Sequence, residues 1–113
     1  MATSRSIEHC TAAVSIFSGR PDPSWHLTNA SLEKLENIWK KLSPSAGAPP
    51  AAPPLGYRGC SVDCGPRGSW IAFGGVVARG EEYRADPGRQ FERTVLNSAP
   101  QGVIPAKVLR LIR

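Results

Sequence analysis

Eleven glycines and eleven prolines are spread along this chain of 113 residues and divide it into short segments. Proline fixes φ and removes a backbone N–H, and glycine favours turns, so neither suits the interior of a helix or a strand. The chain is therefore restricted to short elements joined by tight turns and loops. Hydrophobic residues make up 41% and charged residues 20%, as in ordinary globular proteins. We expect one domain over residues 1–113.

Alternating side chains predict three strands in this domain. Residues 10–17 alternate with apolar residues on both faces, which is typical of a strand inside a sheet. Residues 57–64 and 70–78 alternate again, and the Gly-containing turn between them predicts an antiparallel hairpin. Gly74 and Gly75 interrupt the second of these runs and indicate a bulge or the close approach of another backbone.

Two segments show helical periodicity. The first is residues 29–42, with Thr28 or Asn29 as the N-cap and one apolar stripe. The second is residues 87–98, with Asp86 as the N-cap and Pro87 at the first helical position. The stripes contain Leu32, Leu35, Ile38, Trp39 and Leu42 in the first helix and Phe91, Val95, Leu96 and Ala99 in the second. Residues 103–113 fit either a last strand or a short helix. The order predicts an α+β fold, a small antiparallel sheet with two helices on one face in the split βαβ, ferredoxin-like plan.

Two loops stand out by their prolines. Residues 20–25 contain Pro21 and Pro23, which predict a rigid extended loop. Residues 43–54 are rich in proline and alanine and form a long connection; the alternative is a polyproline II ligand for another protein.

The loop at residues 20–25 suggests a binding site, which it would form together with the loop around Tyr57 and Arg58 that precedes the hairpin. Because one loop leaves the first strand and the other enters the second, we expect them to adjoin. Arg20 and Arg58 would then offer planar donors to a carboxylate or phosphate, with Trp25 and Tyr57 as stacking surfaces and Asp22 beside them. The alternative is that Trp25 closes the core while Arg20 pairs internally. We predict a non-enzymatic binding or protein-interaction domain, whose partner is an unknown protein or a small anionic ligand.

A second hypothesis is a single-stranded nucleic-acid-binding domain. The net charge is +1 over residues 1–56, zero over 57–88 and +4 over 89–113, so the excess of +5 is C-terminal. Arg89, Arg93, Lys107, Arg110 and Arg113 provide it, with Trp70 and Phe73 as the stacking residues. Phosphate-binding glycine motifs are absent, and the aromatic positions of an RNA-recognition motif are not filled, so no nucleotide cofactor is expected.

The three cysteines give the least specific signal. No secretory signal or membrane-spanning run is recognisable, so we expect a cytoplasmic protein in which Cys10, Cys60 and Cys64 are reduced and buried. A cross-strand disulfide to Cys10 is the alternative in an oxidising compartment. His9 and Cys10 are adjacent and would point to opposite faces, and the cysteine spacing is not that of a zinc knuckle. We assign no catalytic or metal-binding residue, and a thiol or metal enzyme remains the third hypothesis.

Overall fold

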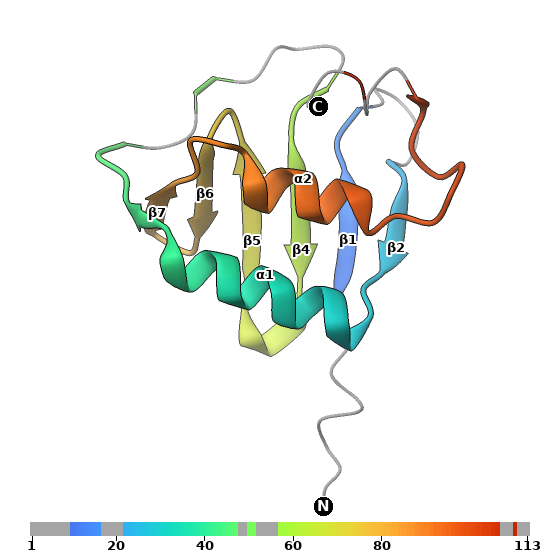
Figure 1. The fold of residues 1–113 in the computed structure, drawn as a ribbon, viewed down its shortest axis with the longest axis horizontal. Helices are drawn as coiled ribbons and strands as arrows, with labels where there is room; N and C mark the ends of the chain where they lie inside the picture. The colour runs from blue at the N-terminus through green and yellow to red at the C-terminus, as the bar shows by residue number, and fades with distance from the viewer. Residues whose placement is uncertain (1–9, 17–21, 48–49, 52–56, 107–109, 111–113) are drawn as a thin grey trace, which may run out of the picture.

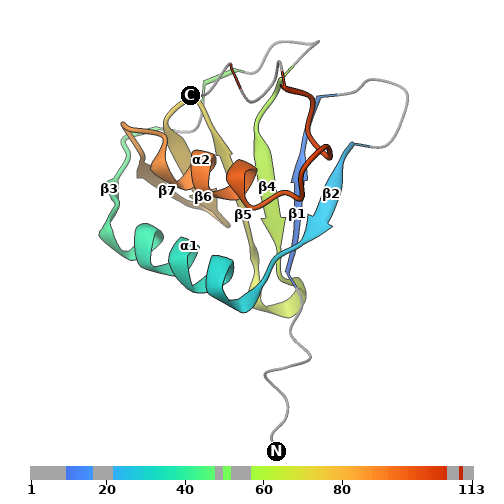
Figure 2. The ribbon, with the colours of Figure 1, turned by 45° about the vertical axis from the view of Figure 1, so that its right-hand side comes forward.

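A single antiparallel sheet forms the body of the protein in the computed structural model, which describes residues 10–16, 22–47, 50–51, 57–106 and 110. Its seven strands lie in the order β2-β1-β4-β5-β6-β7-β3. Both helices lie on the same face of this sheet (Figures 1 and 2). The strands are β1 (Thr11–Val14), β2 (Ser24–His26), β3 (Ser43–Pro44), β4 (Cys60–Asp63), β5 (Ser69–Phe73), β6 (Val76–Arg79) and β7 (Glu82–Ala85).

The predicted ferredoxin-like plan is wrong. That plan has one strand before the first helix and a single hairpin between the two helices. Here β2 pairs with β1 and reverses the chain before the helix begins. The strand that follows the helix, β3, pairs with β7 at the far edge of the sheet, and β4 to β7 then run consecutively before the second helix. β4 pairs with β1, and all neighbours in the sheet are antiparallel. The result is a seven-stranded antiparallel sheet in place of a four-stranded one.

The predicted return strand over residues 70–78 is two strands. Gly74 and Gly75 have φ values of +63° and +88°, and together they make the turn between β5 and β6. Such dihedrals are accessible to glycine at little cost. A close neighbour is also present: a Cβ atom on Gly74 would lie 2.6 Å from Pro50 Cγ. The glycine pair thus marks both a reversal of the chain and a contact with the proline-rich segment.

The two proline loops contain the remaining unexpected strands. Ser24–His26, predicted as part of a rigid loop, forms β2, and the carbonyl of Pro23 accepts a hydrogen bond from Val14 N at 3.1 Å. Ser43–Pro44, the start of the predicted long connection, forms β3 beside β7. Both are edge strands, where a missing proline N–H breaks no inner ladder. Hydrogen-bonded pairing therefore outweighs the turn-forming composition at both places.

Both helices form close to their predicted positions. In α1 (Asn29–Lys41) the Thr28 hydroxyl accepts from Ser31 N at 3.1 Å, and the buried face carries Leu35, Ile38 and Trp39. α2 (Gln90–Asn97) begins three residues later than predicted, because Arg89 has a left-handed φ of +54° and Pro87 lies outside the helix.

Asp86 caps α2 from a distance. Its buried carboxylate accepts from the backbone N–H groups of Gln90, Phe91 and Glu92 at 2.8, 2.9 and 3.4 Å. A carboxylate at this end is also favoured by the partial positive charge of the helix N-terminus.

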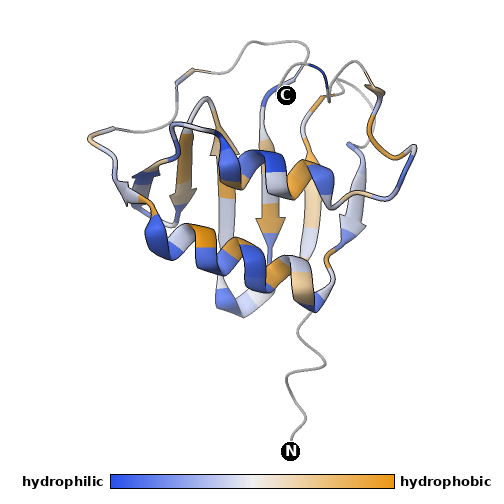
Figure 3. Ribbon diagram, viewed as in Figure 1, coloured by the Kyte–Doolittle hydropathy of each residue, from blue (hydrophilic) through white to orange (hydrophobic). Residues whose placement is uncertain are grey.

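Aromatic rings fill the space between the sheet and the helices. Trp70 of β5 contacts Trp39 of α1 and Phe91 of α2, with ring centroids 6.5 and 5.5 Å apart. Arg79 and Arg84 place their guanidinium groups over the Trp70 and Trp39 rings at 4.6 and 4.2 Å. Hydrophobic colour is concentrated in the middle strands, whereas β2 and β7 at the sides are more hydrophilic (Figure 3). Val108, Leu109, Leu111 and Ile112, the apolar residues of the predicted last element, lie outside the described residues.

Candidate functional site

Among the described residues, no helix covers the sheet face opposite α1 and α2, which we call the open face (Figure 2). Side chains on neighbouring strands share a face where their residues are paired, and pairing continues from β1 to β7. One row of paired residues on this face is uncharged and consists of Ala13, Ser61, Ile71, Ala78 and Tyr83. We call this set the open-face row. Ile71 at its centre is 54% exposed, whereas Trp70 beside it points into the core.

A pocket of about 300 Å³ adjoins this row at one end of β1 and β4. Its lining includes Ala13, Ser61 and Ile71 of the open-face row together with Asp22 and Arg58. Apolar floor and charged rim therefore occur in one concave surface, as in many ligand sites.

The predicted adjacency of the two loops is found at this pocket. Arg58 N donates to Ser15 O at 2.8 Å, and Ser15 N donates to Gly59 O at 2.9 Å, so the second loop continues the pairing of β1. Asp22 Oδ1 accepts from Ile16 N at 3.0 Å, which holds the first loop against the end of β1. The sequence-predicted residues Asp22 and Arg58 are thereby brought together.

Two of the other three predicted site residues, Trp25 and Tyr57, do not line the pocket. Trp25 is buried among core residues, and its indole N–H donates to Ser98 Oγ at 2.8 Å. Tyr57 is half-buried, and its hydroxyl donates to Glu92 Oε2 of α2. Arg20 lies outside the described residues.

Glu92 forms a buried polar cluster that the sequence analysis missed. It is 1% exposed, and no hydrogen bond to its Oε1 is present within the described part of the chain. Burial raises the pKa of the Glu92 carboxyl, opposed by the hydrogen bond from Tyr57 and the charge of Arg89. Burial likewise raises the pKa of Tyr57. A signal was available, because Glu92 lies three and four residues before Val95 and Leu96, on the apolar stripe of its helix.

The expectation of three reduced cysteines is wrong for two of them. Cys10 precedes Thr11 and Cys64 follows Asp63, so the two cysteines lie one step beyond the last pair of β1 with β4. A disulfide joins them, and their Cα atoms lie 4.2 Å apart. Closely spaced pairs of this kind in antiparallel strands bring two cysteines within bonding reach.

Cys60 remains a buried thiol. Its Sγ lies 4.0 Å from the Glu92 carbonyl oxygen, and burial raises its pKa well above the ordinary range. A thiol that resists ionisation is a poor nucleophile. Among the described residues, no three or more His, Cys, Asp or Glu side chains gather in a way that would hold a metal ion.

Neither aromatic residue of the nucleic-acid hypothesis is fully exposed. Trp70 is enclosed by Trp39, Phe91 and Arg79, so its ring has no free face on which a base would stack. Phe73 is three residues further along the same strand and half-buried, with its ring 6.0 Å from that of Tyr57. Lys107 and Arg113 lie outside the described residues.

Similarity to known proteins does not indicate a function for this chain. None of the described helices is both long and apolar enough to cross a membrane. No protein-family model, curated protein or solved structure matches this chain.

Proposed function

We propose that this protein is a non-enzymatic binding domain that holds a short segment of another protein on the open face of its sheet. The observation that carries the proposal is Ile71, which is 54% exposed at the centre of an uncharged row. Among the described residues, Ile71 is the single large hydrophobic residue that is exposed to solvent.

The composition of the open-face row is unusual for a solvent-facing sheet. An antiparallel sheet with one buried face normally alternates apolar residues inward and polar residues outward. Here Ala13, Ile71 and Ala78 face outward at positions where charged or long polar side chains are expected. Small side chains leave the backbone accessible and cost little conformational entropy when they are covered. These properties suit a surface that is covered by a partner.

The size of the face favours a short segment over a second folded domain. The five strands that carry the open-face row, spaced by about 4.8 Å and each about four residues long at ~3.3 Å per residue, cover a flat area of roughly 300 Å². A stable protein–protein interface buries about 800 Å² on each partner. A single extended or helical segment would cover the open face without needing that larger area.

The pocket suggests what the segment carries. Arg58 already makes a contact within the chain. Because a guanidinium has five N–H donors in a planar fork, Arg58 can also donate hydrogen bonds to a carboxylate of the partner. Ile71 lines the same pocket and would contact an aliphatic side chain. We therefore expect a segment with an aliphatic residue close to an Asp, a Glu or a C-terminal carboxylate.

The proposal is tested by selecting binders from a library of random peptides and measuring their affinity for the folded chain by fluorescence anisotropy. Ile71→Lys places a charge at the centre of the open face, and we expect it to weaken binding at least about tenfold, which is about 1.4 kcal/mol. The matched control is Asn37→Lys, because Asn37 is exposed on α1, on the other side of the sheet. This control should leave the affinity unchanged.

Three results would contradict the proposal. The first is a library selection that yields no peptide, and the second is a set of peptides that bind Ile71→Lys as tightly as the unchanged protein. The third is a concentration-dependent dimer that Ile71→Lys abolishes, because the open face would then bind a second copy of this chain. Chemical-shift changes confined to Ala13, Ser61, Ala78 and their neighbours on adding peptide would support it.

A further inference from the structure

The bond between Cys10 and Cys64 joins two distant parts of the chain at the end of the sheet opposite the pocket. The two residues are separated by 54 positions, and the loop that they close contains β1, β2, α1, β3 and β4. Cys10 precedes β1 and Cys64 follows β4, so the bond extends the pairing of these two strands by one step. Its position in the register means that the folded backbone brings the two cysteines together without further movement.

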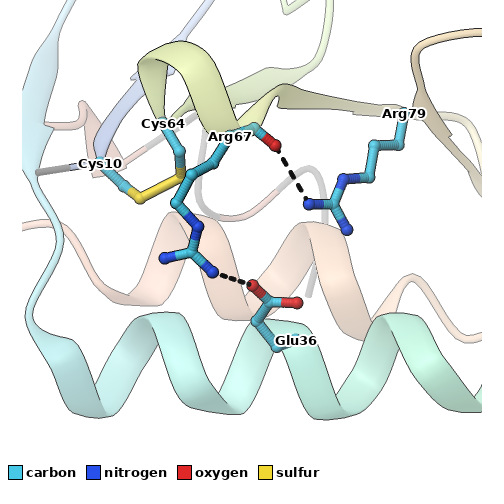
Figure 4. Close-up of polar contacts among 5 residues, drawn as sticks. All are labelled: Cys10, Glu36, Cys64, Arg67 and Arg79. Carbon is cyan, nitrogen blue, oxygen red and sulfur yellow. Dashed lines mark hydrogen bonds and ion pairs between the residues drawn. A yellow bond between two sulfur atoms is a disulfide. The ribbon is translucent and has the colours of Figure 1, made fainter. Parts of the chain in front are cut away.

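Both cysteines of the bond are buried. Cys10 is 2% and Cys64 is 8% exposed. The short turn Gly65–Arg67 follows Cys64, and the Arg67 side chain extends past the disulfide toward Glu36 of α1 (Figure 4). Arg67 Nη2 lies 3.4 Å from Glu36 Oε2, and Arg79 Nη2 donates to Arg67 O at 3.3 Å. On this side of the bond, a thiolate from solvent therefore meets the Arg67 turn before it reaches the sulfur atoms.

Cys60 is poorly placed to exchange with this bond. It lies on the same strand face as Cys64 with Val62 between them, and in an extended strand their Cα atoms are roughly 13 Å apart. Its thiol packs against α2 beside the Glu92 carbonyl. In the folded chain, Cys10 and Cys64 are therefore bonded to each other, and the Cys60 thiol is held away from both.

We propose that Cys10–Cys64 is a lasting structural crosslink, sheltered by the Arg67 turn, and that this chain is built for an oxidising compartment. Its formation converts two thiols to one disulfide, and the two electrons and two protons pass to a disulfide-bearing oxidant such as oxidised glutathione. Reduction runs in reverse: a thiolate attacks one sulfur, the other cysteine leaves as a thiolate, and a second external thiol releases the first. Disulfides of this kind persist mainly in oxidising compartments. The cytoplasmic location predicted from the sequence is not compatible with this inference.

The crosslink itself is tested by counting thiols in the full chain after refolding in a glutathione buffer at the redox potential of the secretory pathway. After denaturation and alkylation, intact mass should show one modified cysteine, and peptide mapping should place the modification on Cys60. Cys60→Ala should show none and should keep the Cys10–Cys64 bond. Three alkylated cysteines, or a bond that involves Cys60, would overturn the inference.

The shelter is tested by the rate at which the folded, oxidised chain is reduced by excess reduced glutathione. Arg67→Ala removes the ion pair with Glu36, and because exchange depends on access, we expect reduction to become roughly threefold faster or more. Lys34→Ala is the matched control, because Lys34 is an exposed cation on the same helix as Glu36. Equal rates for all three proteins, after correction for any difference in global stability, would refute the shelter. Complete reduction of the unchanged folded protein as fast as the unfolded chain would refute the lasting crosslink.

Discussion

Reducing the Cys10–Cys64 bond should remove a large part of the stability of this protein. The bond closes a loop of about 55 residues. For a loop of this length, the chain-entropy relation predicts that the intact bond lowers the conformational entropy of the unfolded state by about 14 cal/mol/K. This stabilises the folded state by about 4 kcal/mol at 25 °C. A domain of this size is typically stable by about 5–15 kcal/mol, so the reduced chain would retain a small margin. The corresponding fall in Tm is roughly 15–30 °C.

Urea denaturation followed by circular dichroism measures this difference. One sample stays oxidised; the other is reduced in denaturant and refolded in the same reductant, so that burial of the bond does not prevent the reaction. Cys60→Ala is the control, because it removes one buried sulfur and leaves the crosslink, and it should cost about 1 kcal/mol, like a buried methylene. If the oxidised and reduced proteins differ by less than about 1 kcal/mol, then β1 and β4 are already close together in the unfolded chain, and the entropy argument fails.

Two further predictions concern a buried acid and a glycine turn. The raised pKa of Glu92 means that its protonated form favours folding; this contribution is present below the unfolded pKa of about 4.3 and is lost as the pH rises through the folded pKa. Glu92→Gln, whose amide oxygen can still accept from Tyr57, should therefore raise the urea midpoint at pH 8 and change it little at pH 4; a midpoint lowered at both pH values would contradict this reasoning. Gly74→Ala should destabilise the protein more than Gly80→Ala, because both residues have φ near +60° but only Gly74 lies against Pro50. Equal thermal shifts of the two variants would show that the Pro50 contact contributes nothing.

The fold was predictable as far as local chemistry determined it. The stripes of the two helices and the alternation of β1, β4 and β5 are direct consequences of burying one face, so their positions follow from sequence. The order of strands was not predictable in this way. It depends on Ser24–His26 pairing with β1, which sends the chain into α1 from the opposite end, and three residues after a proline give little signal of a strand. In the sequence, Gly74 and Gly75 fit a bulge as well as a turn. The pairing of Ala72 with Val77 in the structure shows that they form a turn.

The site was predictable where backbone connections determine it. Asp22 and Arg58 line the same pocket because the segments around them flank the paired strands β1 and β4. Which way the neighbouring aromatic residues point depends on register, and a shift by one residue moves a side chain to the other face. Trp25 pairs with the inward-facing Ala12, so it packs in the core instead of on the pocket. The exposure of Ile71 follows from the same rule, since its neighbour Trp70 is the larger residue to bury.

Under the proposed function, the two faces of the sheet divide stability from binding. The aromatic core, the capping carboxylate of Asp86 and the disulfide all lie on the helix-covered side or at the end of the sheet. Ile71 and the pocket lie on the other side, and substitutions at exposed positions usually change stability by less than about 0.5 kcal/mol. Ile71→Lys should therefore weaken peptide binding with little change in Tm, while Asp86→Ala should lower Tm without altering the pocket. If Ile71→Lys unfolded the protein, the open face would be part of the core of a larger assembly, and the independence of the two faces would be lost.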